Sequence, residues 1–156
     1  MSKYDISIMS DDQINYNSLS EITLRDLVLG DDLFVATSAL ATLAMRKSNL
    51  AGELAGKILE NMLGDDYLQS AAINILFDSD RSRSLELLIE RMATCKPYIF
   101  NTILELMIQN TDVFKSTATY PIVRLALERI DQVTKPSKWP SREVLDSFLE
   151  IFGQDG

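Results

Sequence analysis

The segment Leu-Gly-Asp-Asp occurs twice in this chain of 156 residues, at positions 29–32 and 63–66. Glycine often ends a helix because it adopts the left-handed conformation without strain, and aspartate often caps the start of a helix. Each copy therefore predicts a tight joint between two consecutive helices. The copies lie 34 residues apart, and a period of thirty-odd residues is typical of repeated helix pairs. The spacing predicts an all-α fold.

Elsewhere the apolar residues recur mostly at helical spacing. The segment Ser18-Leu19-Ser20-Glu21 reads as a capping box and predicts that the first helix begins at Ser18. Pro97 suits the first turn of a helix over 97–110, which is apolar on nearly every side and should be the most buried element. Strand-like alternation occurs only at 4–8, and the proline-rich stretch 134–140 predicts a loop. Eight helices, or four pairs, are expected over 18–30, 31–47, 48–63, 65–77, 81–94, 97–110, 112–132 (begun or interrupted near Pro121) and 144–152.

The residues after each joint resemble the second helix of a HEAT-type repeat, whose consensus runs through aspartate, valine, a basic residue and small alanines. The basic residue is replaced by Ala36 in the first copy and by Gln69 in the second. The resemblance is clearest over 18–78 and implies one all-α domain over 1–156, a short HEAT-like solenoid of about four stacked antiparallel helix pairs. The matching positions are Asp31, Val35, Ala39 and Leu43 in the first copy, and Asp65, Leu68, Ala71, Ala72 and Leu76 in the second.

The composition argues against most enzyme chemistry, because the chain contains no histidine. Catalytic triads, histidine bases and histidine-bound zinc are thereby excluded, and no glycine-rich phosphate-binding motif is present. Residues 78–89 resemble a calcium loop, but Arg83 replaces its turn glycine and Ile89 its bidentate glutamate. We therefore expect no catalytic residue, no metal and no cofactor, with a carboxylate-only enzyme as the open alternative. Cys95 and three methionines (Met62, Met92 and Met107) are expected to fill the core.

Charge is unevenly distributed along the chain. Residues 1–80 carry 5 basic and 13 acidic residues, whereas residues 81–156 carry 10 of each. The excess acid disfavours nucleic acid and anionic membranes as partners and favours a basic protein; acid that only maintains solubility is an equal alternative. Without a signal peptide or a long apolar run, the chain is expected to be cytoplasmic.

Equivalent joints of stacked helix pairs lie side by side at helix-packing distance. Asp31 and Asp32 are therefore expected beside Asp65 and Asp66, where together they would attract a cationic partner. Tyr67 would be an exposed interface anchor beside them or, equally, a half-buried side chain. The alternative is that the aspartates only cap helices. The binding surface would then lie on the inner face of the second helices, around Thr37, Gln69 and Asn74.

In its size, acidity and HEAT-like pattern, the chain resembles bacterial immunity proteins of contact-dependent growth inhibition and related polymorphic toxin systems. That resemblance implies a non-catalytic protein that binds and neutralises a cognate basic, nuclease-type toxin domain. The alternative is a HEAT-like scaffold or adaptor for endogenous protein partners. Such a scaffold would bind its partners more weakly and would have no cognate toxin.

Overall fold

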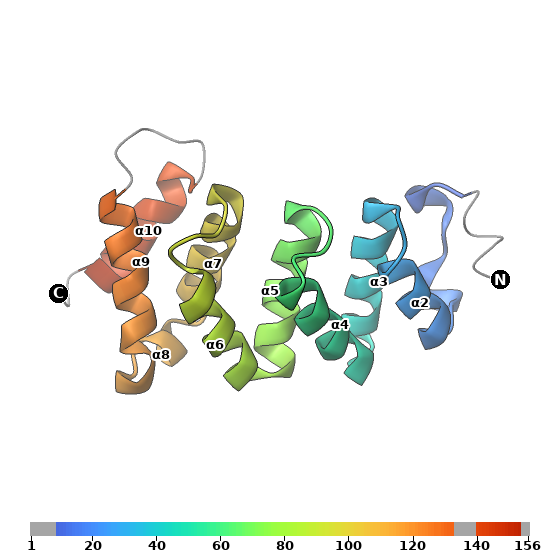
Figure 1. Cartoon of the computed structure of the whole chain (residues 1–156), viewed down its shortest axis with the longest axis horizontal. Helices are drawn as coiled ribbons and strands as arrows, with labels where there is room; N and C mark the ends of the chain where they lie inside the picture. Colours follow the sequence, from blue (N-terminus) through green and yellow to red (C-terminus); the bar gives the residue numbers. More distant parts are fainter. Residues whose placement is uncertain (1–8, 133–139, 154–156) are drawn as a thin grey trace. The chain divides into compact units, whose positions relative to one another are not determined.

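The computed structural model describes residues 9–132 and 140–153, and every regular element in these ranges is helical (Figure 1). The predicted all-α class is confirmed for this part of the chain. The strand-like segment 4–8 lies outside the described residues, as does the predicted loop 134–140 except for Pro140. The described residues divide into two compact units, and the boundary along the chain falls between Arg81 and Ser82.

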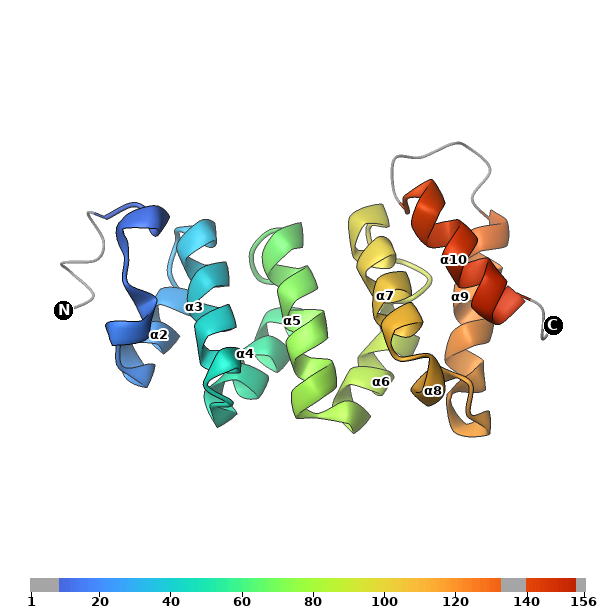
Figure 2. The ribbon, with the colours of Figure 1, turned by 180° about the vertical axis from the view of Figure 1, so that it is seen from behind.

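Unit 1 contains the helices that flank both joints. α2 packs mainly against α3, and α4 packs mainly against α5; α3 also contacts α5, and α2 contacts α4. α3 and α5 lie side by side and begin at the same end of the unit (Figures 1 and 2). The elements are η1 Asp11–Gln13, η2 Tyr16–Ser18, α2 Glu21–Val28, α3 Leu33–Met45, α4 Asn49–Glu60 and α5 Asp66–Ser79.

Both predicted joints have their aspartate cap, but glycine does not end the preceding helix as predicted: Gly30 is not left-handed, and Gly64 (φ 73°) lies four residues beyond the end of α4 at Glu60. Asp32 accepts hydrogen bonds from the backbone N–H groups of Phe34 (3.1 Å) and Val35 (3.2 Å) at the start of α3. Asp65 accepts one from Leu68 N–H (2.9 Å) at the start of α5. The cap is thus the second aspartate of the first joint and the first aspartate of the second. The caps are 33 residues apart, one fewer than the copies of the sequence motif.

Two predicted helix ends in unit 1 are wrong. The first helix begins at Glu21 with Ser20 as its cap, because Ser18 lies in the 3-10 turn η2 and its hydroxyl donates to Asn15 C=O (2.7 Å). α4 ends at Glu60 rather than near residue 63. Beyond it the backbone of Met62 is left-handed (φ 52°), and the Met62 side chain is 60% exposed. Met62 is therefore not a core residue, whereas Met92 and Met107 are fully buried as predicted.

Unit 2 is organised around α7, where seven of thirteen residues are buried, more than in any other described helix. α7 packs against α10, and the buried Asn101 accepts a hydrogen bond from Ser141 N–H (2.8 Å) just before α10. The predicted helix 112–132 is split into two helices and a 3-10 turn, with Pro121 in the first turn of the longer helix. The elements are α6 Arg81–Arg91, α7 Pro97–Gln109, α8 Thr111–Phe114, η3 Thr117–Thr119, α9 Tyr120–Gln132 and α10 Arg142–Phe152. The described residues therefore contain nine α-helices rather than eight.

Candidate protein-binding face

The four aspartates of the joints all precede or begin α3 and α5, and these helices start at the same end of unit 1 (Figure 2). Asp31 and Asp32 are exposed, and Asp65 and Asp66 are half-buried. The capping role is confirmed for Asp32 and Asp65. The four carboxylates together outweigh the partial positive charge of the two helix N-termini beside them, so this end of the unit is negative.

Tyr67 is the second residue of α5 and is 63% exposed. The equivalent residue of α3 is Phe34, which lies 33 positions earlier and is 76% exposed. Sequence reasoning missed Phe34 because the motif period of 34 pairs Tyr67 with Leu33 instead. Counting from the aspartate caps would have identified it, since Phe34 and Tyr67 both follow their caps by two positions.

The three alternative site residues do not share one surface. Thr37 and Gln69 are half-buried, and only Asn74 is exposed. Gln69 donates to Leu63 C=O (3.4 Å), which turns its amide toward the loop before α5. Asn74 follows Gln69 by five positions, which corresponds to about 140° around the helix axis. Asn74 instead lies seven positions after Tyr67, on the same stripe of α5.

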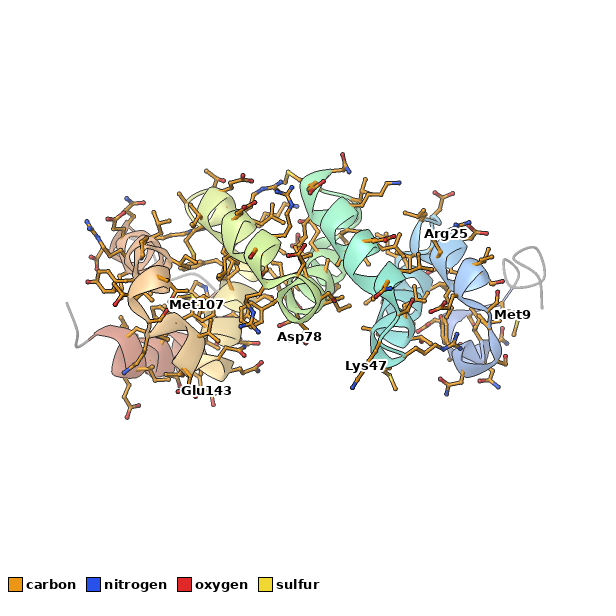
Figure 3. All side chains as sticks on the ribbon, turned by 90° about the horizontal axis from the view of Figure 1, so that it is seen from below. Met9, Arg25, Lys47, Asp78, Met107 and Glu143 are labelled. Carbon is orange, nitrogen blue, oxygen red and sulfur yellow. The ribbon has the colours of Figure 1, made fainter. Side chains whose placement is uncertain are left out.

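A continuous outward stripe follows α3 and α5 in the 33-residue register. On α3 the stripe has no charge, although Phe34 and Met45 at its two ends are 76% and 79% exposed. In Figure 3, Asp78 at the end of the α5 stripe projects on the side of unit 1 away from α2 and α4. We call this surface the α3–α5 face; it consists of Phe34, Ser38, Ala41 and Met45 of α3 with Tyr67, Ala71, Asn74 and Asp78 of α5.

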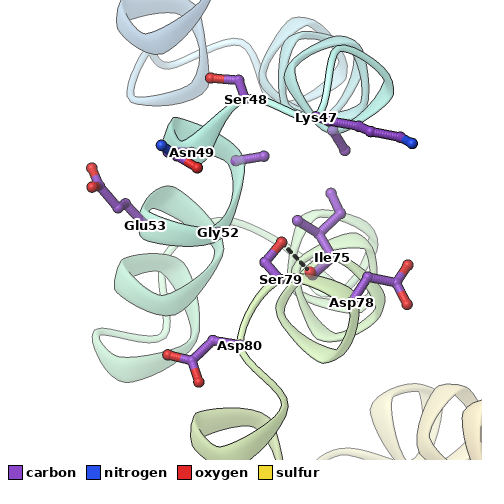
Figure 4. A pocket seen from close by; sticks show the side chains of 11 residues that line it. Lys47, Ser48, Asn49, Gly52, Glu53, Ile75, Asp78, Ser79 and Asp80 are labelled. Carbon is purple, nitrogen blue, oxygen red and sulfur yellow. Dashed lines mark hydrogen bonds between the residues drawn. The ribbon is translucent and has the colours of Figure 1, made fainter.

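A hollow of about 610 Å³ adjoins the Asp78 end of this face, among the end of α3, the start of α4 and the end of α5. Its charged lining residues have both signs: Lys47 and three acids, Glu53, Asp78 and Asp80. In Figure 4 these side chains spread outward around the rim and do not converge on a common point. The hollow therefore lacks the convergent groups that hold a small ligand.

Among the residues that the structure describes, Cys95 and Tyr16 have perturbed pKa values. Burial raises the pKa of the Cys95 thiol, and the Arg129 guanidinium, which donates to its sulfur (2.9 Å), opposes that rise. Burial, together with a hydrogen bond to Asp11, raises the pKa of the Tyr16 hydroxyl. A raised pKa makes the Cys95 thiol a poor nucleophile, because the reactive form is the thiolate. Within the described ranges, no three Cys, Asp or Glu side chains gather closely enough to hold a metal ion.

No family model, curated protein or solved structure matches the chain. No helix within residues 9–132 and 140–153 is long and apolar enough to cross a membrane.

Proposed function

We propose that the chain is a non-catalytic protein-binding module, an immunity protein that binds and neutralises a basic, nuclease-type toxin domain in the cytoplasm. The observation that carries the proposal is the placement of Asp31, Asp32, Asp65 and Asp66 at the shared starting end of α3 and α5. Unit 1, residues 1–81, has 6 basic and 13 acidic residues, a net charge of −7. Such a surface attracts a basic domain from a distance and competes with the phosphates that the domain would otherwise bind.

The finer architecture belongs to the same proposal. We infer that the helix pairs stack as a short HEAT-like solenoid, and the contacts inside unit 1 support this arrangement. α2 pairs with α3, α4 pairs with α5, and the two pairs meet through α3 with α5 and α2 with α4. A stack of this kind places equivalent residues of successive pairs next to each other.

The test is co-expression with the neighbouring open reading frame, followed by pull-down and a growth assay. An immunity protein should co-purify with a basic domain and restore growth to cells that express this domain. If the neighbouring product does not bind and does not affect growth, the immunity role fails. A scaffold that binds endogenous partners would rescue no toxin.

The aspartates are tested in the same assay by changing all four to asparagine, which still caps a helix but has no charge. We expect the variant to fold normally and to lose affinity for the basic domain, mainly at low salt, where charges are least screened. Unchanged affinity at low salt would mean that the aspartates are only caps.

A further inference from the structure

The second helix of unit 1, α3, has an unusual composition for a surface helix. Its sequence, Leu33–Met45, contains no charged residue, and it is the only described α-helix without one. Helices that are apolar all round are normally buried on all sides. α3 nevertheless leaves Phe34, Ala41 and Met45 exposed on the side opposite its buried residues.

We propose that the α3–α5 face binds an amphipathic helix of a partner protein, with the apolar side of that helix on Phe34, Met45 and Tyr67. Lysine or arginine residues at one end of that helix would lie against the joint aspartates. The inference rests on the proposed protein-binding function and adds the form of the partner segment and the side chains that anchor it.

The stripe is the flank of a helix, and another helix can pack along such a flank with its ridges in the grooves. Phe34, Ser38, Ala41 and Met45 follow one another at intervals of four, three and four residues, which is the spacing of one helix face. The stripe spans eleven residue steps, or about 17 Å along the axis, and the α5 stripe runs beside it. Helix flanks offer no unpaired backbone groups, so an extended strand could not add to them by main-chain pairing. Recognition must then come from side chains.

Charge determines the direction in which the partner helix lies on the face, and it disfavours a second copy of this chain as the partner. At the starting end of the face lie four aspartates, whereas at the far end Lys47 lies among acids that include Asp78 and Asp80. The basic residues of the bound helix are therefore expected at the aspartate end. A second copy of this chain would bring two units of net charge −7 together, and like charges across an interface disfavour the complex.

The probe is a synthetic amphipathic helix of leucine and lysine, about 18 residues long so that it spans the face. Its binding to the full chain is followed by fluorescence anisotropy. One control peptide has the same composition in a scrambled order without an apolar face, and another has glutamate in place of lysine. We expect the wild-type protein to bind the basic amphipathic peptide and neither control. No binding, or equal binding to the scrambled peptide, would overturn the inference.

The decisive variant is Phe34→Ser/Met45→Ser/Tyr67→Ser, with Ile22→Ser as the matched control. Ile22 is 64% exposed but lies on α2, away from the face. Because these side chains are exposed, circular dichroism should show an intact fold for both proteins. We expect the triple variant to lose at least about tenfold in affinity, as removal of several anchor residues does, and Ile22→Ser to change affinity by less than about twofold.

The outcomes separate this inference from the proposed function. If the asparagine variant loses affinity and the triple serine variant does not, the acidic site stands and the apolar face is overturned. If the glutamate peptide binds as well as the lysine peptide, the basic partner of the proposed function fails instead. Light scattering gives a further check: a dimer of the wild-type chain that the triple variant abolishes would identify a second copy as the occupant and overturn the inference.

Discussion

Gly52 of α4 lies close to Ser79 at the end of α5. A Cβ atom at this position would lie 2.8 Å from the Cβ of Ser79, whereas one at Gly56, a turn later, would lie 3.9 Å from Leu76 Cδ1. Replacing a helical glycine with alanine gains about 0.5–1 kcal/mol where space allows, but overpacking costs about 1–3 kcal/mol. The two glycines should therefore respond in opposite directions.

Gly52→Ala should lower the free energy of unfolding measured in urea, and Gly56→Ala should raise it by about 0.5–1 kcal/mol. Ser79→Gly should restore part of the stability lost in Gly52→Ala, because it removes the atom that clashes. Equal stabilisation by both alanines would show that α4 and α5 do not approach as closely as the structure has them.

The joints supply a second test at single residues. Asp32 caps α3 through two backbone N–H groups, and its neighbour Asp31 is not the cap. Asp32→Ala should cost about 1 kcal/mol of unfolding free energy, whereas Asp31→Ala should change it by less than about 0.5 kcal/mol. A larger loss in Asp31→Ala than in Asp32→Ala would show that Asp31 is the cap of α3. The two caps would then be 34 residues apart, like the copies of the sequence motif.

Cys95 should react slowly while the protein is folded. Burial raises its pKa, so the thiolate fraction at mildly alkaline pH is smaller than for a free thiol. Alkylation by iodoacetamide should be slow in buffer and fast in urea. A folded-state pKa above the unfolded value contributes stability that is present below the unfolded pKa and is lost as the pH rises through the folded pKa. Stability should therefore decline in alkaline solution, and Cys95→Ser should reduce that decline. Equal alkylation rates in buffer and in urea would contradict the burial of the Cys95 thiol.

At the level of the elements, Arg129 of α9 makes a long-range contact in unit 2 with the turn after α6. Arg129 donates to Met92 C=O (2.7 Å) and to Cys95 C=O, and its guanidinium lies 4.5 Å from the centre of the Phe100 ring. Hydrogen bonds from a charged donor contribute about 1.5–3 kcal/mol. The turn between α6 and α7 is thereby fixed to a helix more than thirty residues later in the sequence.

Arg129→Met should therefore lower the unfolding free energy by about 1.5–3 kcal/mol. Arg124 on the same helix is the matched control, because it is 65% exposed and pairs with Glu128 only at 3.8 Å. Arg124→Met should cost less than about 1 kcal/mol, as exposed ion pairs do. Comparable losses of unfolding free energy in both variants would show that the contacts of Arg129 with the turn after α6 add no particular stability.

Local patterns in the sequence were enough to predict the all-α class, the aspartate caps of both joints and the buried helix 97–110, but not the division of 112–132 into α8, η3 and α9. The Ser20 cap of the first helix was missed because two serines compete for the cap, and only the 3-10 turn at Tyr16–Ser18 decides between them. Phe34 was missed because the copies of the Leu-Gly-Asp-Asp motif are 34 residues apart, whereas the aspartate caps are 33 residues apart. The Arg129 contact has no signal in the sequence, since it joins segments 34 to 37 residues apart.

At the level of the whole molecule, the division of charge matches the division into units. Residues 1–81 have a net charge of −7, and residues 82–156, with 9 basic and 10 acidic residues, a net charge of −1. Unit 1 also contains the α3–α5 face. Long-range attraction and close apolar contact can therefore act on the same partner through one unit, the attraction mainly on the association rate and the apolar contact mainly on dissociation.

The most direct test of this account is the salt dependence of binding between the chain and the proposed basic partner domain. Wild-type affinity should weaken steeply as ionic strength rises, because exposed charges are screened over about 10 Å at 0.1 M salt. With Asp31, Asp32, Asp65 and Asp66 all changed to asparagine, the affinity should be lower at low salt and should vary much less with salt. The same affinity and the same salt dependence in both proteins would contradict the claim that the joint aspartates bind a basic partner.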